Sequence, residues 1–284
     1  MINAEWSLVF FTLLGQFSTG VLLCAFVFNL FPGTTGASAE KITRSAAKAA
    51  FVLMAIALAL SFLHLSSPLS AIYALSNLQD SWLSREILMA STYAFLAFML
   101  LLQTLYRPGN QLLQKILLPV TVLAGLAMVY TMARLYMIET VPVWNTPKTL
   151  VSFYASVLLA GSAIFMVIFS KDQEKTTVQA PKKPASILFI MTAGLFLKLF
   201  TLVIPYRGIA EANTGFAVTA TGGPWMFLHW ALLAIGALLA IVNLQKQRSS
   251  KVVSGYYVSA LLCFVLAEII ARADFYASFF RIGI

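Results

Sequence analysis

Two ionisable residues flank one semi-apolar stretch of the chain. His64 ends a long apolar run and Glu86 begins the next, and the stretch between them, LSSPLSAIYALSNLQDSWLSR, has Asp80 as its one charge before Arg85. Ionisable groups at the edge of a long apolar run are costly and are typical of functional sites. Histidine changes charge near neutral pH. The pair therefore predicts a site that handles protons for a lipid-soluble molecule.

The composition indicates a membrane protein. Of the 284 residues, 60% are hydrophobic and 10% are charged, whereas about a quarter of the residues in soluble domains are charged. A helix needs ~20 mostly apolar residues to cross the hydrocarbon core. We therefore predict an all-α integral membrane protein, with eight transmembrane helices in one polytopic domain that covers residues 1–284. The apolar runs lie near 8–30, 48–64, 86–105, 116–137, 149–170, 185–205, 225–245 and 252–271.

The basic residues predict the orientation of these helices. Twelve Lys and Arg residues lie around the odd-numbered connections, and six lie around the even-numbered connections and the C-terminal tail. Such a bias in short loops places the odd-numbered connections in the cytoplasm. Both termini then face outward, to the periplasmic side of a bacterial inner membrane. The net charge of +9 is accounted for by topology, and we do not expect nucleic acid as a partner.

Most ionisable residues of the apolar runs lie toward their outward ends, which predicts a one-sided site and not a path through the membrane. Each also has a structural interpretation. Arg134, Lys198 and Arg272 can extend their charged ends to the interface. His229 can belong to the interfacial aromatic belt. Glu268 can pair with Arg272 one helical turn later.

Redox cofactors bound by this chain are not expected. Cys24 and Cys263 lie inside apolar runs, and two cysteines cannot supply the four thiolates of an iron–sulfur cluster. Two stacked b-haems need four histidines, and the chain has two, His64 and His229. A single haem between these histidines is the alternative, although neither lies in a groove of small residues that would hold a porphyrin. We therefore predict neither haem nor a metal site.

The longer connections 65–85, 138–148 and 206–224, with the tail 272–284, fall on the predicted outward side. Part of their aromatic content is the belt found in membrane proteins generally, but elaborate loops on one side predict a docking surface. The two halves of the chain show no repeat, which gives no support to an inverted-repeat transporter. The aromatic residues on that side are Tyr73, Trp82, Tyr136, Trp144, Tyr206, Trp225, Phe275 and Tyr276.

Several long segments resemble the family of membrane anchor subunits of bacterial anaerobic dimethyl sulfoxide (DMSO) reductase and its close paralogue. They are EWSLVFFTLLGQFSTG, HLSSPLSAIYALSN followed by SWLSREI, MARLYMIETVPVWNT and RADFYASFFR, which are spread over the whole chain. The resemblance implies eight helices, outward termini and no haem. It leaves open which paralogue this is, and which S-oxide, N-oxide or selenate acceptor is served.

The resemblance also implies a role in anaerobic respiration. The family's anchor is not catalytic alone; it oxidises menaquinol near the outer face and passes electrons to an iron–sulfur subunit. That subunit delivers them to a molybdopterin catalytic subunit, which reduces the oxide. The family's quinol-site histidine falls on His64 and its acidic partner on Glu86. Further candidates for binding the quinol or a docked subunit are Arg134, Lys198, Glu268 and Arg272.

Two other functions remain as alternatives. A small-molecule or ion transporter needs polar residues or broken helices near the middle of the membrane, and these are scarce in the sequence. A purely structural anchor would tolerate replacement of His64 and Glu86 without loss of quinol-driven activity. Quinol subunits of the polysulfide reductase type are a near neighbour of the leading interpretation.

Overall fold

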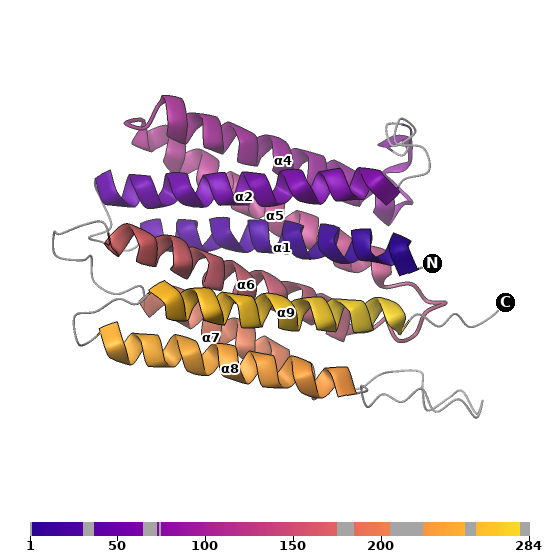
Figure 1. The fold of residues 1–284 in the computed structure, drawn as a ribbon. Coiled ribbons are helices and arrows are strands. Elements are labelled where there is room, and N and C mark those ends of the chain that lie inside the picture. The colour runs from indigo at the N-terminus through magenta and orange to yellow at the C-terminus, as the bar shows by residue number, and fades with distance from the viewer. Residues whose placement is uncertain are drawn as a thin grey trace.

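The computed structural model describes residues 2–30, 37–64, 73, 75–174, 185–204, 224–247 and 254–278, and these form an all-helical bundle, as predicted. Eight α-helices of the described part lie side by side along one direction (Figure 1). They are α1 (Ile2–Leu30), α2 (Ala37–His64), α4 (Trp82–Tyr106), α5 (Gln111–Tyr136), α6 (Pro147–Glu174), α7 (Ala185–Phe200), α8 (Pro224–Gln247) and α9 (Ser254–Ala277), with a short 3₁₀ turn η2 (Leu75–Asn77) before α4.

Six of the described helices, α1, α2, α4, α5, α6 and α8, are long and apolar enough to cross a membrane. The apolar part of α7, Ile187–Phe200, is shorter, and α9 is not among the six. Large apolar side chains cover the outside of the bundle, among them Phe189, Phe227 and Leu238. An exterior of this kind suits a lipid environment and would be a liability in water.

The structure begins α2 at Ala37 and not near residue 48. The extra turns, ASAEKITRSAAKAA, are rich in alanine, the best helix former. They also carry an ion pair four residues apart, in which Arg44 Nη2 lies 2.9 Å from Glu40 Oε1. The basic segment that we assigned to a connection is therefore helical.

The structure also extends α9 to Ala277, beyond the predicted end near residue 271. Part of the predicted outward tail is thus helix. Tyr276 of this segment is buried in the hydrophobic core and not available for docking. Our assignment of the whole segment 272–284 to an outward tail is wrong over its first residues, because α9 continues to Ala277 and buries Arg272 and Tyr276 inside the bundle.

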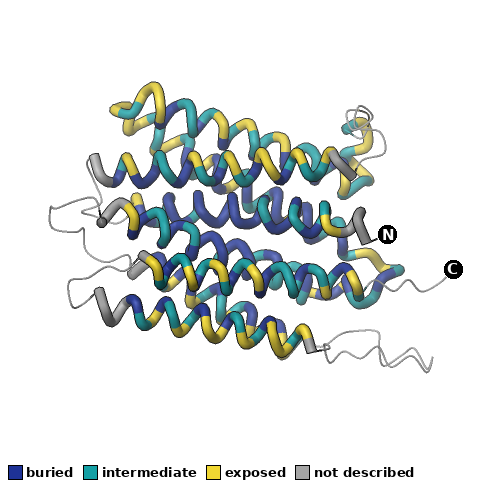
Figure 2. Tube along the Cα trace, viewed as in Figure 1, coloured by how far each residue is buried: buried dark blue, intermediate teal, exposed yellow. Residues whose placement is uncertain are grey.

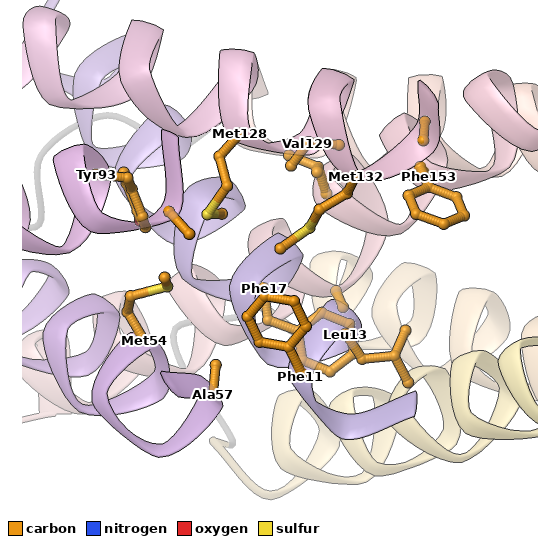
Figure 3. Close-up of a cluster of buried hydrophobic side chains, with 14 of the residues drawn as sticks. Phe11, Leu13, Phe17, Met54, Ala57, Tyr93, Met128, Val129, Met132 and Phe153 are labelled. Atoms are coloured by element: carbon orange, nitrogen blue, oxygen red, sulfur yellow. The ribbon is translucent and has the colours of Figure 1, made fainter. Parts of the chain in front are cut away.

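α1 is the central helix of the bundle. It packs against α2, α5, α6 and α9, and it is buried along most of its length while outer helices alternate between buried and exposed positions (Figure 2). Its side chains Phe11, Leu13 and Phe17 form a core with residues of α2, α4, α5 and α6, such as Tyr93 and Met132 (Figure 3). The first half of α1 therefore packs into a hydrophobic core that it shares with α2, α4, α5 and α6.

α1 and α6 cross at two glycines. A Cβ atom on Gly20 would lie 2.8 Å from the Cα of Gly161 and would overlap the backbone carbonyl of Val157. A Cβ atom on Gly161 would overlap Gly20 and lie 2.9 Å from the amide nitrogen of Val21. Small residues at such crossings allow helix backbones in membranes to approach closely.

We expect Gly161→Val to destabilise the protein by about 3 kcal/mol, because backbone atoms of α1 cannot move aside as a side chain would. The melting temperature of the detergent-solubilised protein measures this. Gly109→Val is the matched control, since no atom lies within 4 Å of a Cβ placed there. Equal melting temperatures for the two variants would contradict the close crossing.

Candidate functional site

The two principal predicted site residues lie at the same end of the bundle. His64 is the last residue of α2, and Glu86 lies in the second turn of α4. These neighbouring helices meet at the end where α1 begins and α9 ends (Figure 1). The side chain of His64 and most of the connection after it lie outside the described residues.

The start of α4 is held by local hydrogen bonds. Ser81 caps the helix by accepting a hydrogen bond from the Ser84 amide at 3.3 Å. Arg85 turns outward, where its Nε donates to the Leu78 carbonyl at 2.9 Å. The guanidinium also lies 4.3 Å from the ring centroid of Trp82. The next residue along the helix, Glu86, consequently faces the interior.

Glu86 is a buried carboxyl group that lacks a full set of hydrogen-bond partners. Its side chain is 4% exposed, and within the described residues its Oε1 atom has no partner. It lies within electrostatic range of the hydroxyls of Tyr136 and Tyr276, and Tyr276 donates to Tyr136 at 2.7 Å. An unsatisfied buried carboxylate is costly. Glu86 is therefore suited to exchange a proton.

An aromatic cluster surrounds this tyrosine pair. Trp144 stacks on Phe275 with ring centroids 5.1 Å apart, and its Nε1 donates to the Phe275 carbonyl at 2.8 Å. Tyr136 packs against Phe153 at 5.9 Å. We predicted Tyr136, Trp144 and Tyr276 for the outward aromatic face, but the structure buries all three in the core. This part of the predicted docking surface is thus wrong.

Lys198 and Glu268 form a buried ion pair between α7 and α9. Lys198 Nζ lies 2.8 Å from Glu268 Oε2, and the two side chains are 4% and 1% exposed. Ser156 of α6 donates to the same carboxylate oxygen at 2.5 Å. The interpretation of Lys198 as a side chain that extends to the interface is therefore wrong, because its charge is paired inside the bundle.

Arg272 is buried near this pair but bonds to a different partner. Its Nη2 donates to Gln16 Oε1 of α1 at 2.9 Å, and its Cζ lies 3.7 Å from the ring centroid of Phe153. Glu268 bonds to Lys198 and Ser156, so the predicted bond between Glu268 and Arg272 is not formed. Arg272 does not reach the interface either, since it is 4% exposed.

The remaining two ionisable residues, His229 and Arg134, make contacts outside the Lys198–Glu268 ion pair. His229 of α8 is buried, and its Nδ1 donates to the Ala267 carbonyl of α9 at 2.9 Å, so it holds two helices together and does not belong to an interfacial belt. Arg134 of α5 is half-buried, with its Cζ 5.0 Å from the Trp82 ring centroid. Arg134 is thus closer to the start of α4 than to the ion pair.

Among the residues that the structure describes, no three His, Cys, Asp or Glu side chains gather as metal ligands. Two hydrogen-bond partners of the candidate residues were not predicted from the sequence, namely Gln16, which bonds to Arg272, and Ser156, which bonds to Glu268. Gln16 left one signal, because it is a lone amide in the apolar segment FFTLLGQFSTG. Ser156 left none, since serine is common in membrane helices.

A helical bundle with an apolar exterior, in which six of the described helices are long and apolar enough to cross a membrane, indicates a multi-pass membrane protein. The chain matches the family model described as "DMSO reductase anchor subunit (DmsC)" over residues 2–278. It therefore belongs to the DMSO reductase anchor subunit family, which confirms the resemblance seen in the sequence.

Three relatives cover nearly the whole length of the protein. The "Anaerobic dimethyl sulfoxide reductase chain YnfH" of Escherichia coli K12 is 27% identical over 281 residues, which cover 98% of this protein and 96% of the relative. The C subunit of anaerobic dimethyl sulfoxide reductase is 26% identical in Escherichia coli K12, with 98% and 96% covered, and 28% identical in Haemophilus influenzae Rd, with 96% and 94% covered. Membership of this family supports a role as membrane anchor in a DMSO reductase complex.

Proposed function

We propose that this chain oxidises menaquinol as the anchor subunit of a DMSO reductase-type complex. In this proposal eight helices span the inner membrane, both termini face the periplasm, and the quinol binds where α2 and α4 meet. The observation that carries the proposal is Glu86, a buried carboxyl with an unbonded oxygen at the end of the bundle that also holds His64.

The chemistry needs two proton acceptors and one path for electrons. Oxidation of one menaquinol to menaquinone releases two protons and two electrons. His64, as a neutral imidazole, accepts the proton of one hydroxyl, and Glu86 accepts or relays the other. The two electrons pass to an iron–sulfur cluster of a partner docked on the periplasmic face. From there they reach a molybdopterin subunit that reduces the S- or N-oxide.

The other candidate site residues differ in how far they are buried, and we assign their roles accordingly. Lys198 and Glu268 are buried and paired with each other, so we assign them to holding α7 against α9. Arg134 is partly accessible beside Trp82, and we assign it to the rim of the quinol site or to the docked subunit. Arg272 has one nitrogen, Nη1, without a partner among the described residues, and this atom is left for a ligand.

The distribution of charge favours this function over transport. In the described part of the chain, the buried charged side chains Glu86, Lys198, Glu268 and Arg272 all lie in the half of the bundle that holds the start of α4 and the ends of α7 and α9. A transporter would place polar groups on both sides of the middle of the membrane.

His64→Ala tests the proposal in membranes that carry the assembled complex. We expect the rate of oxide reduction driven by a menaquinol analogue to fall at least about tenfold, because the first proton acceptor is lost. Reduction driven by a viologen dye, which feeds the soluble subunits directly, stays at the wild-type rate.

Tyr106→Ala, an exposed position at the opposite end of α4, serves as the control and keeps both rates. If His64→Ala retains the quinol-driven rate, His64 is not a proton acceptor and the protein serves as an anchor alone or binds quinol elsewhere.

A further inference from the structure

Gln16 and Arg272 present two unused hydrogen-bond donors beside the aromatic cluster. Both side chains are more than nine-tenths buried. Within the described residues, Gln16 Nε2 and Arg272 Nη1 have no hydrogen-bond partner. The 2.9 Å bond from Arg272 Nη2 to Gln16 Oε1 joins the two residues, so both free donors belong to one hydrogen-bonded pair.

The chemistry of the two groups fixes which atoms are free. A guanidinium group can only donate hydrogen bonds, so the amide must turn its oxygen toward Arg272 and its NH₂ group away. The ring of Phe153 covers one face of the guanidinium at 3.7 Å. The remaining bonds of Arg272 must therefore form in the guanidinium plane, where Nη1 is free.

The charges of the buried cluster point to the kind of ligand. Lys198 neutralises Glu268 at 2.8 Å, which leaves Arg272 bonded to an uncharged amide. The ring of Phe153, which covers Arg272, also packs against Tyr136 with ring centroids 5.9 Å apart, and Glu86 lies within electrostatic range of the same tyrosine. The group that Gln16 and Arg272 both lack is thus an oxygen acceptor, to which Arg272 offers a positively charged donor.

We propose that Gln16 and Arg272 bind one ring oxygen of the quinol head group and hold it after its proton has left. This inference rests on the proposed function and adds two binding residues to it. A deprotonated quinol oxygen is an acceptor that a charged donor stabilises more strongly than a neutral one. Removal of the donors weakens binding without removing the proton acceptors.

Gln16→Glu is the sharpest test because it keeps the size of the side chain. The new carboxylate forms an ion pair with Arg272, so the contact between α1 and α9 is retained while the free amide donor and the positive charge are lost. We expect the KM for menadiol, a soluble menaquinol analogue, to rise about tenfold or more. The amount of assembled complex and the viologen-driven rate stay at wild-type values.

A second substitution of Gln16 and a control substitution separate the loss of the donor from a general loss of folding. Gln16→Met removes the donor without adding charge and is expected to raise the KM for menadiol in the same direction. Arg44→Met is the matched control, since Arg44 lies at the far end of α2 in a half-exposed pair with Glu40 and should leave the KM unchanged.

A wild-type KM for menadiol in assembled Gln16→Glu complex overturns the inference. A phospholipid phosphate is the other oxygen acceptor with this chemistry. Loss of co-purified phosphatidylglycerol in native mass spectra, with the KM unchanged, therefore also overturns it. When His64→Ala loses quinol-driven activity but both Gln16 variants keep it, only this inference fails; when none of them changes the rate, the proposed function fails as well.

Discussion

Lys198→Met is expected to destabilise the bundle by about 3–5 kcal/mol, because it leaves Glu268 without a counter-charge in the interior. Ser156 remains as a donor to Glu268 Oε2, but a hydroxyl does not replace a cation. Glu268 Oε1 has no partner in the described part of the chain even in the native protein. Of the described cations, Lys198 is the one that bonds to Glu268, while Arg272 and His229 act on it only from a distance.

A second ion pair in the same protein shows why burial decides the size of this effect. Arg44 and Glu40 lie 2.9 Å apart, about as close as Lys198 and Glu268 at 2.8 Å. Their side chains are 34% and 30% exposed. Water and lipid headgroups can replace a lost partner there, so Arg44→Met should cost about 0.3–0.5 kcal/mol.

The melting temperature and the yield of the purified complex measure both changes. We expect a large loss for Lys198→Met and almost none for Arg44→Met. The double variant Lys198→Met with Glu268→Met should recover most of the loss, since an apolar pair removes both charges at once. If Lys198→Met melts like Arg44→Met, the buried pair does not hold α7 to α9.

The helices of the described part could be predicted because each apolar run is long enough to be recognised without knowing its neighbours. Helix ends were harder. Ala37 begins α2 well before its apolar run does, since alanine-rich polar turns continue the helix beyond the apolar part. The end of α9 was missed for the same reason, because Arg272 and Asp274 resemble the start of a polar tail although they belong to the helix.

The side of the bundle on which the ionisable residues gather could be predicted, but their pairing could not. Charges near predicted helix ends indicate a common half of the bundle, and the structure places Glu86, Glu268 and Arg272 in one half. The choice of partner depends on tertiary packing. Spacing of one helical turn favours a bond between Glu268 and Arg272, yet α7 brings Lys198 to Glu268 from 70 residues away. No pattern within one helix can reveal such a contact.

Glu86→Gln is expected to lower the kcat of quinol-driven oxide reduction about a hundredfold or more, because an amide of the same shape cannot accept a proton. The viologen-driven rate should not change. Glu86 Oε1 has no partner within the described residues, so the substitution breaks no bond at that atom, and the melting temperature should stay near the wild-type value. A loss of activity without a loss of stability separates a chemical role from a structural one.

Glu86→Asp and Glu40→Gln complete this test. Aspartate keeps an acceptor but withdraws it by one methylene, so the kcat should fall between the wild-type and Glu86→Gln values. Glu40→Gln changes a carboxyl at the opposite end of the bundle, where Glu40 pairs with Arg44, and should have no effect on the quinol-driven rate. Equal activity of Glu86→Gln and wild type would show that Glu86 does not accept a proton from the quinol. The burial of its unbonded carboxyl oxygen would then have no explanation in the proposed function.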